Sequence, residues 1–486
     1  MFNHNKFFST LIVLAFFIFS FPVNILSQSD KTQLFDSYLS EYFFNKKIPS
    51  ISAGISKNDK IIWLGVRGIS DLELLTRATY NSLYRIASIS KPITATAILQ
   101  LYERGKIDID QDVRNYVPSF PTKKWKITIK QLLNHTSGIR GYKEGEFHSK
   151  KYYPNALEAI KVFAYDSLQF QPGTKYEYTS LGYTLLAAVI ENVTKNSFEN
   201  FLVENIFIPA GMKNTKVDKQ KIIIPNRVRG YEKDFNREFQ NAPLADLSIK
   251  VAGGGLLANA EDLLLFANAL MNEKLISAKS FQLMTTPTQL KNGNKVNYGL
   301  GFALSFENDS LKKVFHTGGG TGFTTMLIIY PNEKISATHL INISDRNLEL
   351  PAIELAKIES GLPYSAPTKT ISDELIGIFN FSGIDSVISF TNSILDSNYL
   401  NCNTSESELI AFAKDLSGLN KTAASIKYLK NLARKFPRSF NIQVALADAY
   451  AKDKNTGLAL RHYRIAWQIN PRNQYVNYKI KELAKK

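Results

Sequence analysis

Runs of β-type sequence lie near both ends of the first 362 residues, and this placement restricts the fold more than any other feature. Apolar runs at residues 51–55 and 61–66 flank a polar turn, and similar runs return at residues 324–330 and 335–343. Helical periodicity marks residues 31–42, 93–101, 183–193, 198–206 and 260–271. One antiparallel sheet, built from both ends of this unit and covered by helices, accounts for the order. We therefore expect an α/β (α+β) fold over residues 28–362.

The β signal ends near residue 362, and we expect a linker at residues 363–382. Beyond it, Phe-Pro-Arg at 436–438 returns as Asn-Pro-Arg at 470–472, an offset of 34 residues, which is the tetratricopeptide length. The packing positions of that repeat hold Phe412, Ala413, Leu416 and Leu432 in one copy, and Leu446, Ala447, Tyr450, Ala459, Tyr463 and Ala466 in the next. Ser425 stands where the earlier copy should have an alanine. We expect all-α repeats over residues 383–486, with a degenerate copy at 383–395 and a capping helix at 474–486.

The first 27 residues have the pattern of a signal peptide. Lys6 precedes an apolar run at residues 7–21, Pro22 ends it, and cleavage after Ser27 is consistent with the pattern. The run is about 15 residues long, short of the ~20 that cross a bilayer. We expect a secreted or periplasmic protein without a transmembrane anchor after cleavage. Its one cysteine, Cys402, excludes an intramolecular disulfide.

The net charge of +16 is spread along the chain, with no block of basic residues and no nucleic-acid-binding motif. No metal-binding motif, Walker loop or G-x-S-x-G elbow occurs. We therefore expect no nucleic-acid partner, no metal and no cofactor.

Ser88 and Lys91 form a Ser-x-x-Lys motif at the start of a strong helical pattern. Residues three apart project from one helix face, so the amine can activate the hydroxyl as a nucleophile. The helix N-terminus favours an oxyanion there. The tetrapeptide at 310–313 also fits the motif, but it reads as a polar loop between strands. Order and context therefore favour Ser88.

Two further motifs follow in order. Tyr178 is a candidate proton shuttle if Lys91 and His316 converge on it and lower its pKa; the alternative is a tyrosine packed under the next helix. Residues 316–320 (His-Thr-Gly-Gly-Gly) follow a strand-like stretch, where glycines allow a substrate backbone to approach and a free N–H can stabilise an oxyanion. The alternative is a glycine-rich hairpin turn. His135 is interpreted as a structural turn residue.

The chain resembles the serine β-lactamase-like family, which includes class C β-lactamases, D-alanyl-D-alanine carboxypeptidases and esterases, and most of all its mitochondrial serine β-lactamase-like type. The matching segments, in order, are residues 84–91, 132–138, 172–174, 178–183, 211–215, 252–256, 298–301 and 316–318. The resemblance implies that Ser88 is acylated and that Lys91 and Tyr178 share the general-base and general-acid work. It also implies an oxyanion hole from the N–H groups of Ser88 and Gly319.

Two positions depart from the family pattern. His316 replaces a lysine, and Ser180 replaces an asparagine. Both changes disfavour antibiotic hydrolysis, because a neutral histidine pairs weakly with a β-lactam carboxylate. With Thr317, Gly318 and Gly319, these residues complete the expected substrate and oxyanion site. We expect a serine hydrolase for a peptide, ester or peptidoglycan-like substrate, of peptidase, esterase or carboxypeptidase type. The alternatives are a β-lactamase and a catalytically silent sensor or scaffold whose repeats bind a protein partner.

Overall fold

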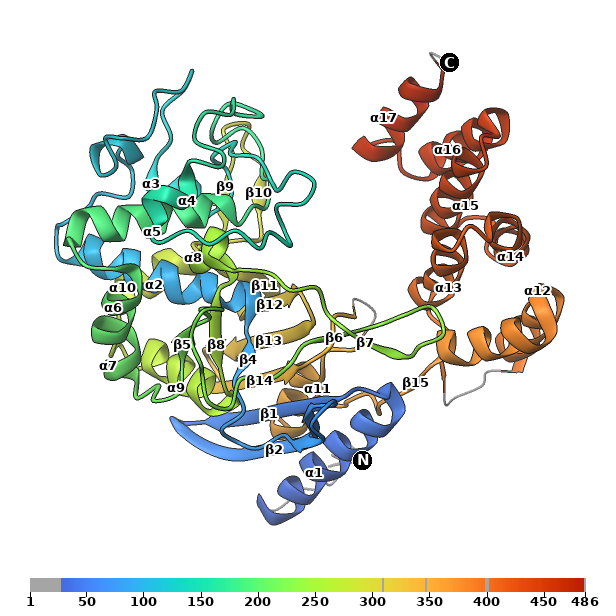
Figure 1. Ribbon diagram of the computed structural model, residues 1–486, viewed down its shortest axis with the longest axis horizontal. Helices are drawn as coiled ribbons and strands as arrows, with labels where there is room; N and C mark the ends of the chain where they lie inside the picture. The colour runs from blue at the N-terminus through green and yellow to red at the C-terminus, as the bar shows by residue number, and fades with distance from the viewer. Residues whose placement is uncertain (1–27, 308–309, 346–347, 398–401, 485–486) are drawn as a thin grey trace, which may run out of the picture.

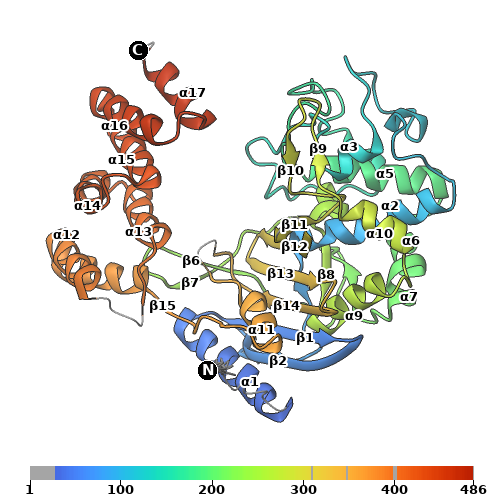
Figure 2. The same cartoon turned by 180° about the vertical axis from the view of Figure 1, so that it is seen from behind.

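The computed structural model describes residues 28–307, 310–345, 348–397 and 402–484 and consists of an α/β unit followed by a helical tail (Figure 1). The expected signal peptide, residues 1–27, lies outside the described residues. The view from behind shows the tail standing beside the α/β unit (Figure 2). Within the described residues, no helix is long and apolar enough to span a bilayer.

The central sheet joins both ends of the α/β unit, as the sequence predicts. Its strand order is β11-β12-β13-β14-β1-β2-β3, and all neighbours are antiparallel. The bounds are β1 (Ser50–Lys57), β2 (Lys60–Asp71), β3 (Thr76–Arg77), β11 (Ala303–Glu307), β12 (Ser310–Gly320), β13 (Phe323–Tyr330) and β14 (Ile335–Ile341). The β1–β14 pairing, with Ala53 opposite His339, brings the two ends together. Asn58 and Asp59 both have positive φ at the β1–β2 turn, as a tight hairpin turn requires. The predicted fold class is confirmed.

Helices cover both faces of this sheet. On one face, α1 (Gln28–Lys46) and α11 (Pro351–Glu359) bury Phe35, Leu39 and Leu355 against β1 and β14. On the other lie α2 (Ser90–Glu103), α5 (Leu181–Thr194) and α9 (Ala260–Met271). With both faces covered, every residue of β14 is buried.

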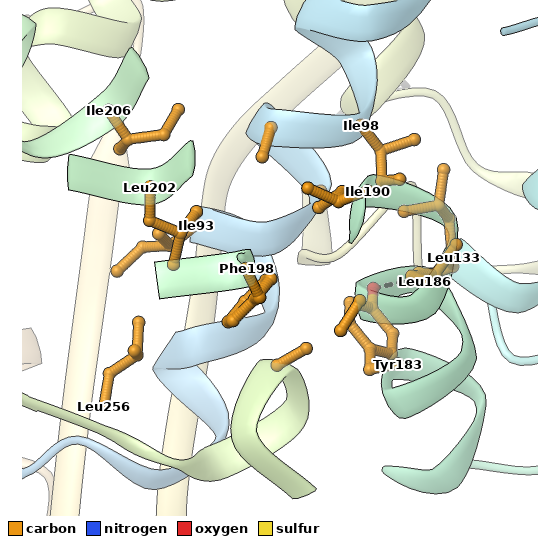
Figure 3. Packing of buried hydrophobic residues seen from close by; sticks show 14 of the residues in the cluster. Ile93, Ile98, Leu133, Tyr183, Leu186, Ile190, Phe198, Leu202, Ile206 and Leu256 are labelled. Carbon is orange, nitrogen blue, oxygen red and sulfur yellow. Dashed lines mark hydrogen bonds between the residues drawn. The ribbon is translucent and has the colours of Figure 1, made fainter. Parts of the chain in front are cut away.

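The part of the core beside Ser88 is built on α2, which is buried along most of its length. Figure 3 shows Ile93 and Ile98 of α2 among side chains of α5 and α6 (Phe198–Leu202). Tyr183 of α5 donates its hydroxyl to the Leu133 carbonyl at 2.8 Å, the bond drawn in that figure. Because α2 is buried against neighbours on every side, the motif at its start is held rigidly.

Shorter elements complete the unit. They are α3 (Ile129–Leu133), α4 (Ala156–Ile160), α7 (Ile208–Ala210), α8 (Val251–Gly254), α10 (Ala278–Met284), β4 (Tyr84–Arg85), β5 (Lys216–Val217), β6 (Tyr231–Lys233), β7 (Phe239–Asn241), β8 (Leu256–Ala258), β9 (Thr288–Gln289) and β10 (Lys295–Val296).

One local expectation differs from the structure. The second Ser-x-x-Lys sequence, expected as a loop, opens β12 at Ser310. A bulge in the β11–β12 pairing interrupts the alternation of side chains here, and Ser310 is exposed at the start of the strand. Among the described residues no hydrogen bond joins Ser310 to Lys313, whereas one joins Lys91 to Ser88.

The tail repeats with a period of 34 residues. Its helices are α13 (Glu406–Gly418), α14 (Thr422–Lys435), α15 (Phe440–Lys452), α16 (Thr456–Ile469) and α17 (Gln474–Leu483). The starts of α13 and α15, and likewise of α14 and α16, are 34 residues apart. The packing residues named from the sequence are all buried. Ser425, which replaces the repeat's alanine, donates its hydroxyl to the Ala413 carbonyl at 2.6 Å, so the buried polar atom is satisfied.

The segment between unit and tail is more ordered than a linker. It contains β15 (Lys369–Thr370), which pairs with β16 (Cys402–Asn403), and α12 (Ile371–Ser397) begins within the range expected to be a linker. Gly383, with φ of 75°, breaks α12 where the repeat region was expected to begin.

The β6–β7 hairpin of the α/β unit reaches the tail, as both views show (Figures 1 and 2). The Phe235 ring lies 6.3 Å from that of Phe379. Arg237 forms ion pairs with Asp373 at 3.3 Å and Asp415 at 3.0 Å. The hairpin tip therefore fastens the tail to the α/β unit.

Candidate active site

Ser88 lies in a tight 3₁₀ turn, Ala87–Ile89, directly before α2. Ala87 has φ of 45°, a left-handed conformation that is unfavourable for a residue with a Cβ atom. Such strain persists only where the surroundings impose it, and it concentrates at functional sites. Ala87 is buried, and the turn offers Ser88 to the cavity described below.

Lys91 is buried with its amine against Ser88. Its Nζ lies 3.0 Å from Ser88 Oγ, 3.1 Å from Ser180 Oγ and 2.6 Å from the Gly253 carbonyl. Burial lowers the pKa of Lys91 well below its ordinary value, and the neighbouring Lys250 lowers it further. A neutral amine can donate to Ser180 and Gly253 and direct its lone pair at the Ser88 hydroxyl, as a general base must.

Gly253 explains how three segments meet at that amine. A Cβ atom at Gly253 would come within 2.9 Å of Ser180 Cβ, closer than non-bonded carbons approach. Only glycine therefore lets α8 bring its carbonyl to Lys91 beside Ser180. The Ser180 hydroxyl contacts the Lys91 amine directly, at the position where the resemblance would place an asparagine.

Tyr178 lies over the same amine, with Lys91 Nζ 4.7 Å from its ring centroid. The expectation of a lowered pKa is wrong. Although 41% of the Tyr178 surface is exposed, desolvation around its hydroxyl raises its pKa, and the neighbouring Ser88 hydroxyl offsets only part of that rise. The cations that should have lowered it, Lys91 and His316, are themselves driven neutral by burial. Tyr178 therefore keeps its proton and is suited to donate it.

Behind Tyr178 runs a directed chain of hydrogen bonds. The Thr179 N–H donates to His135 Nδ1 at 3.3 Å, so the other nitrogen of this ring carries the proton. His135 Nε2 lies 3.2 Å from Tyr298 Oη, and that oxygen lies 3.0 Å from His316 Nε2. His316 Nδ1 then lies 2.7 Å from the Thr317 carbonyl.

These hydrogen bonds hold both histidines in neutral tautomers. Each donates once and accepts once, and burial lowers the pKa of His316 to about 3. The His135 ring also lies against Tyr178, with centroids 4.3 Å apart. The chain thus connects the backbone next to Tyr178 with the backbone of the glycine-rich strand. His135 is a turn residue, as expected, and it also positions the site.

The glycine-rich segment is the end of strand β12 and not a hairpin turn. In the described residues, β11 begins opposite Phe315, so β12 is paired from His316 to Gly320 with β13 alone. A Cβ atom at Gly318 would lie 2.4 Å from the Ile86 carbonyl, so only glycine allows the strand to pack beside the Ser88 turn. Gly319 faces open space. Thr317 is exposed on the same strand.

Two connected hollows adjoin this strand. A groove of about 560 Å³ is lined by Thr317 to Thr321 and by Phe147. A cavity of about 30 Å³ lies next to it and is lined by Ser88, Ser180, Gly253 and Gly319. The two share Phe147 and the glycine strand. Among the described residues, no cluster of His, Cys, Asp or Glu could hold a metal ion.

The sequence reasoning did not identify Tyr298 or Lys250, a second lysine that lines the small cavity. Tyr298 belongs to the Tyr-Gly-Leu-Gly segment that carries part of the family resemblance. That resemblance is the feature of the sequence that could have identified it. Lys250 precedes the Gly253 turn by three residues, and nothing in its local pattern distinguishes it from other lysines.

Comparisons with known proteins agree with this geometry. The β-lactamase family model matches residues 35–359. Penicillin-binding protein 4* of Bacillus subtilis is 31% identical over 307 residues, which cover 60% of this chain and 67% of that protein. The human mitochondrial serine β-lactamase-like protein LACTB is 27% identical over 379 residues, with 59% and 69% covered.

Solved structures share the fold. The octameric penicillin-binding protein homologue from Pyrococcus abyssi superimposes with a TM-score of 0.59 at 24% identity, over 72% of this chain and 81% of that one. The D-amino acid amidase from Ochrobactrum anthropi gives a TM-score of 0.59 at 23% identity, over 68% and 98%. With two thirds of the sequence matched by the family model, this chain belongs to the β-lactamase family of serine hydrolases.

Proposed function

We propose that this protein cleaves amide or ester bonds, of a peptide, an ester or a peptidoglycan-like stem, through an acyl-enzyme on Ser88. The observation that carries the proposal is the buried Lys91 amine, 3.0 Å from Ser88 Oγ, with no carboxylate partner in the described residues. An unpaired buried amine is costly to a fold. Its use as a base for the adjacent hydroxyl gives a reason for it to be there.

The first step joins Ser88 Oγ to the carbonyl carbon of the substrate. Lys91 takes the hydroxyl proton as the bond forms, and the N–H groups of Ser88 and Gly319 are assigned to the developing oxyanion. The bond to the leaving nitrogen or oxygen then breaks. Tyr178, which holds its proton, gives it to the leaving group and recovers one from Lys91. A water molecule then attacks the acyl carbon and gives a proton to Lys91. The bond from that carbon to Ser88 Oγ breaks, Lys91 returns the proton to Ser88, and the acid is released.

The surroundings of His316 support a peptidase or esterase over a β-lactamase. Both ring nitrogens are used, one by Tyr298 and one by the Thr317 carbonyl. The ring is neutral, so it offers neither charge nor a free donor to a β-lactam carboxylate. We expect a chromogenic cephalosporin to be turned over well below the ordinary enzymatic range of ~1–10³ s⁻¹.

A fluorophosphonate probe tests the mechanism. The mature protein should be labelled at Ser88, as mapped by mass spectrometry, and the label should disappear in Lys91→Ala. Ser310→Ala, which alters the other Ser-x-x-Lys sequence, is the matched control and should keep full labelling. Absence of a label, or a label elsewhere, would instead support the silent scaffold, with the repeats as the working surface.

The same proposal includes export of the protein from the cytoplasm and the binding of a protein partner by the helical tail. The apolar segment before residue 27 supports secretion or a periplasmic location, and the 34-residue helical repeats support a protein-binding role for the tail, because such arrays present extended concave surfaces. N-terminal sequencing of the mature protein after fractionation tests the first point. A new terminus near residue 28 in the exported fraction is expected.

A further inference from the structure

The active site contains a second buried lysine that the mechanism does not use. Lys250 ends the 3₁₀ helix Ser248–Lys250, directly before α8, and only 5% of its surface is exposed. Its Nζ donates to the Phe147 carbonyl at 2.7 Å and lies 3.6 Å from the centroid of the Phe147 ring. The backbone of the Phe147 loop thus satisfies one of the three protons of an ammonium group.

Lys250 has no counter-charge. Among the described residues, no carboxylate lies within ion-pair distance of its Nζ, although many other basic residues of the chain are paired. Arg85, the other cation that lines the cavity, donates to Asp218 at 2.6 Å and is neutralised there. A buried cation without a partner is costly. Lys250 is therefore the cationic group left available to an incoming anion.

The position of Lys250 connects it to the chemistry. It lines the cavity of about 30 Å³ together with Ser88 and Gly319, a space for a small group rather than a whole substrate. Tyr142 lines the same cavity, and its buried hydroxyl makes no hydrogen bond of normal geometry. An amine and a phenol with unused donors thus meet beside the acylation centre, where the two oxygens of a carboxylate could accept one bond each.

We propose that Lys250, assisted by Tyr142, binds a carboxylate of the substrate, so that the enzyme prefers peptides or esters with a negative charge close to the scissile bond. This inference rests on the proposed function of Ser88 and names its substrate class. Lys250 is a different residue from His316, which replaces the lysine of the family pattern. The His316 ring is neutral, and both of its nitrogens are already hydrogen-bonded. The adjoining groove holds the rest of the substrate, because it shares Phe147 and the glycine strand with the cavity.

A pair of chromogenic esters tests the inference in the full-length protein. The 4-nitrophenyl monoester of glutaric acid carries a free carboxylate, and its methyl ester is neutral; both release 4-nitrophenol. We expect the wild-type kcat/KM to favour the acidic ester by about 10-fold or more, as a charge-assisted hydrogen bond implies. Lys250→Met should remove this preference, mainly by raising KM for the acidic ester, so that the ratio of the two kcat/KM values approaches unity. Because Lys250 also lowers the pKa of Lys91, the readout is this ratio and not the turnover of the neutral ester alone. Lys250→Arg should retain most of the preference.

The controls separate the possible failures. Lys150→Met removes one exposed positive charge from the same loop region and should leave the preference intact. Equal turnover of the two esters by the wild type, or a preference that survives Lys250→Met, overturns the inference while leaving the proposed function standing. Equal losses on both esters with a lower melting temperature would make Lys250 a clamp for the Phe147 loop and also overturn it. Failure of the proposed function is distinct: neither ester is cleaved in a Ser88-dependent way.

Discussion

The catalytic unit and the helical tail treat buried polar groups in opposite ways. In the tail repeats, Ser425 donates to a backbone carbonyl, and Tyr463 donates to Asp448. In the catalytic cleft, Lys91 and Lys250 are buried as amines without carboxylate partners in the described residues. Polar groups that pair with one another serve packing, whereas buried amines without a counter-charge at a cavity cost stability and are expected where chemistry or binding uses them. This difference in how buried polar groups are paired indicates that the cleft is the site of chemistry or binding and that the polar groups of the tail stabilise its packing.

The largest expected effect is on hydrolysis, and it comes from a substitution in the cleft. Lys91→Met removes the general base, so kcat/KM for an ester substrate should fall by about 10²–10⁴-fold. The melting temperature should change little, because the gain from removing a buried amine without an ionic partner offsets the loss of its hydrogen bond to the Gly253 carbonyl. Lys452→Met, an exposed lysine of the tail, is the control and should keep full activity. Retention of activity within threefold by Lys91→Met would remove Lys91 from its role.

The reverse pattern is expected in the tail. Leu446 is buried between the repeat helices, and Leu446→Ala should destabilise the tail by about 2–5 kcal/mol through lost burial and a cavity. Hydrogen exchange followed by mass spectrometry should show faster exchange in α15 and α16 while hydrolysis stays unchanged. A parallel loss of activity would contradict the separation and would implicate the β6–β7 hairpin in supporting the site.

Near the junction of the tail with the α/β unit, the tail contains a buried carboxyl group, Glu408, whose titration should make the stability of the protein depend on pH. Burial, and then the nearby Asp345, raise the pKa of Glu408 to about 7. The folded state therefore binds this proton more tightly than the unfolded state. Stability should fall as pH rises from about 4.5 to 7, by at most roughly 3 kcal/mol, and stay lower above pH 7.

Glu408→Gln should remove that dependence. Urea denaturation at pH 5 and pH 8, monitored for the tail, measures the difference between the variant and the wild type. The variant should gain stability relative to the wild type at pH 8 and little at pH 5. An identical pH dependence in both proteins would show that Glu408 is not the titrating group at the junction.

Patterns that depend on short spacing could be predicted from the sequence, and convergence over long distances could not. The antiparallel sheet built from both ends of the unit was predicted from its β-type runs, the tail from its 34-residue period, and the Ser88–Lys91 contact from a spacing of three residues. The order of the strands was not predicted. The Tyr298 contact with His135 spans 163 positions and leaves no local pattern. The lowered pKa expected for Tyr178 failed because it assumed charged neighbours, and only the folded structure shows that burial neutralises them.

The smallest of these effects tests the chain behind Tyr178. Tyr298→Phe leaves the His135 Nε2–H and the His316 Nε2 lone pair buried without partners, at a cost of about 1–3 kcal/mol in stability. We expect kcat to fall by about 10-fold, because small displacements of positioned groups slow catalysis. The ¹⁵N shifts of both imidazoles should move, since the tautomers are no longer fixed by one hydroxyl. Tyr84→Phe removes a buried hydroxyl that contacts Ser50, so it should lose stability without changing kcat or the imidazole shifts. If Tyr298→Phe matches that control in both readouts, the chain contributes packing alone, and the cleft then differs from the tail only at its two lysines.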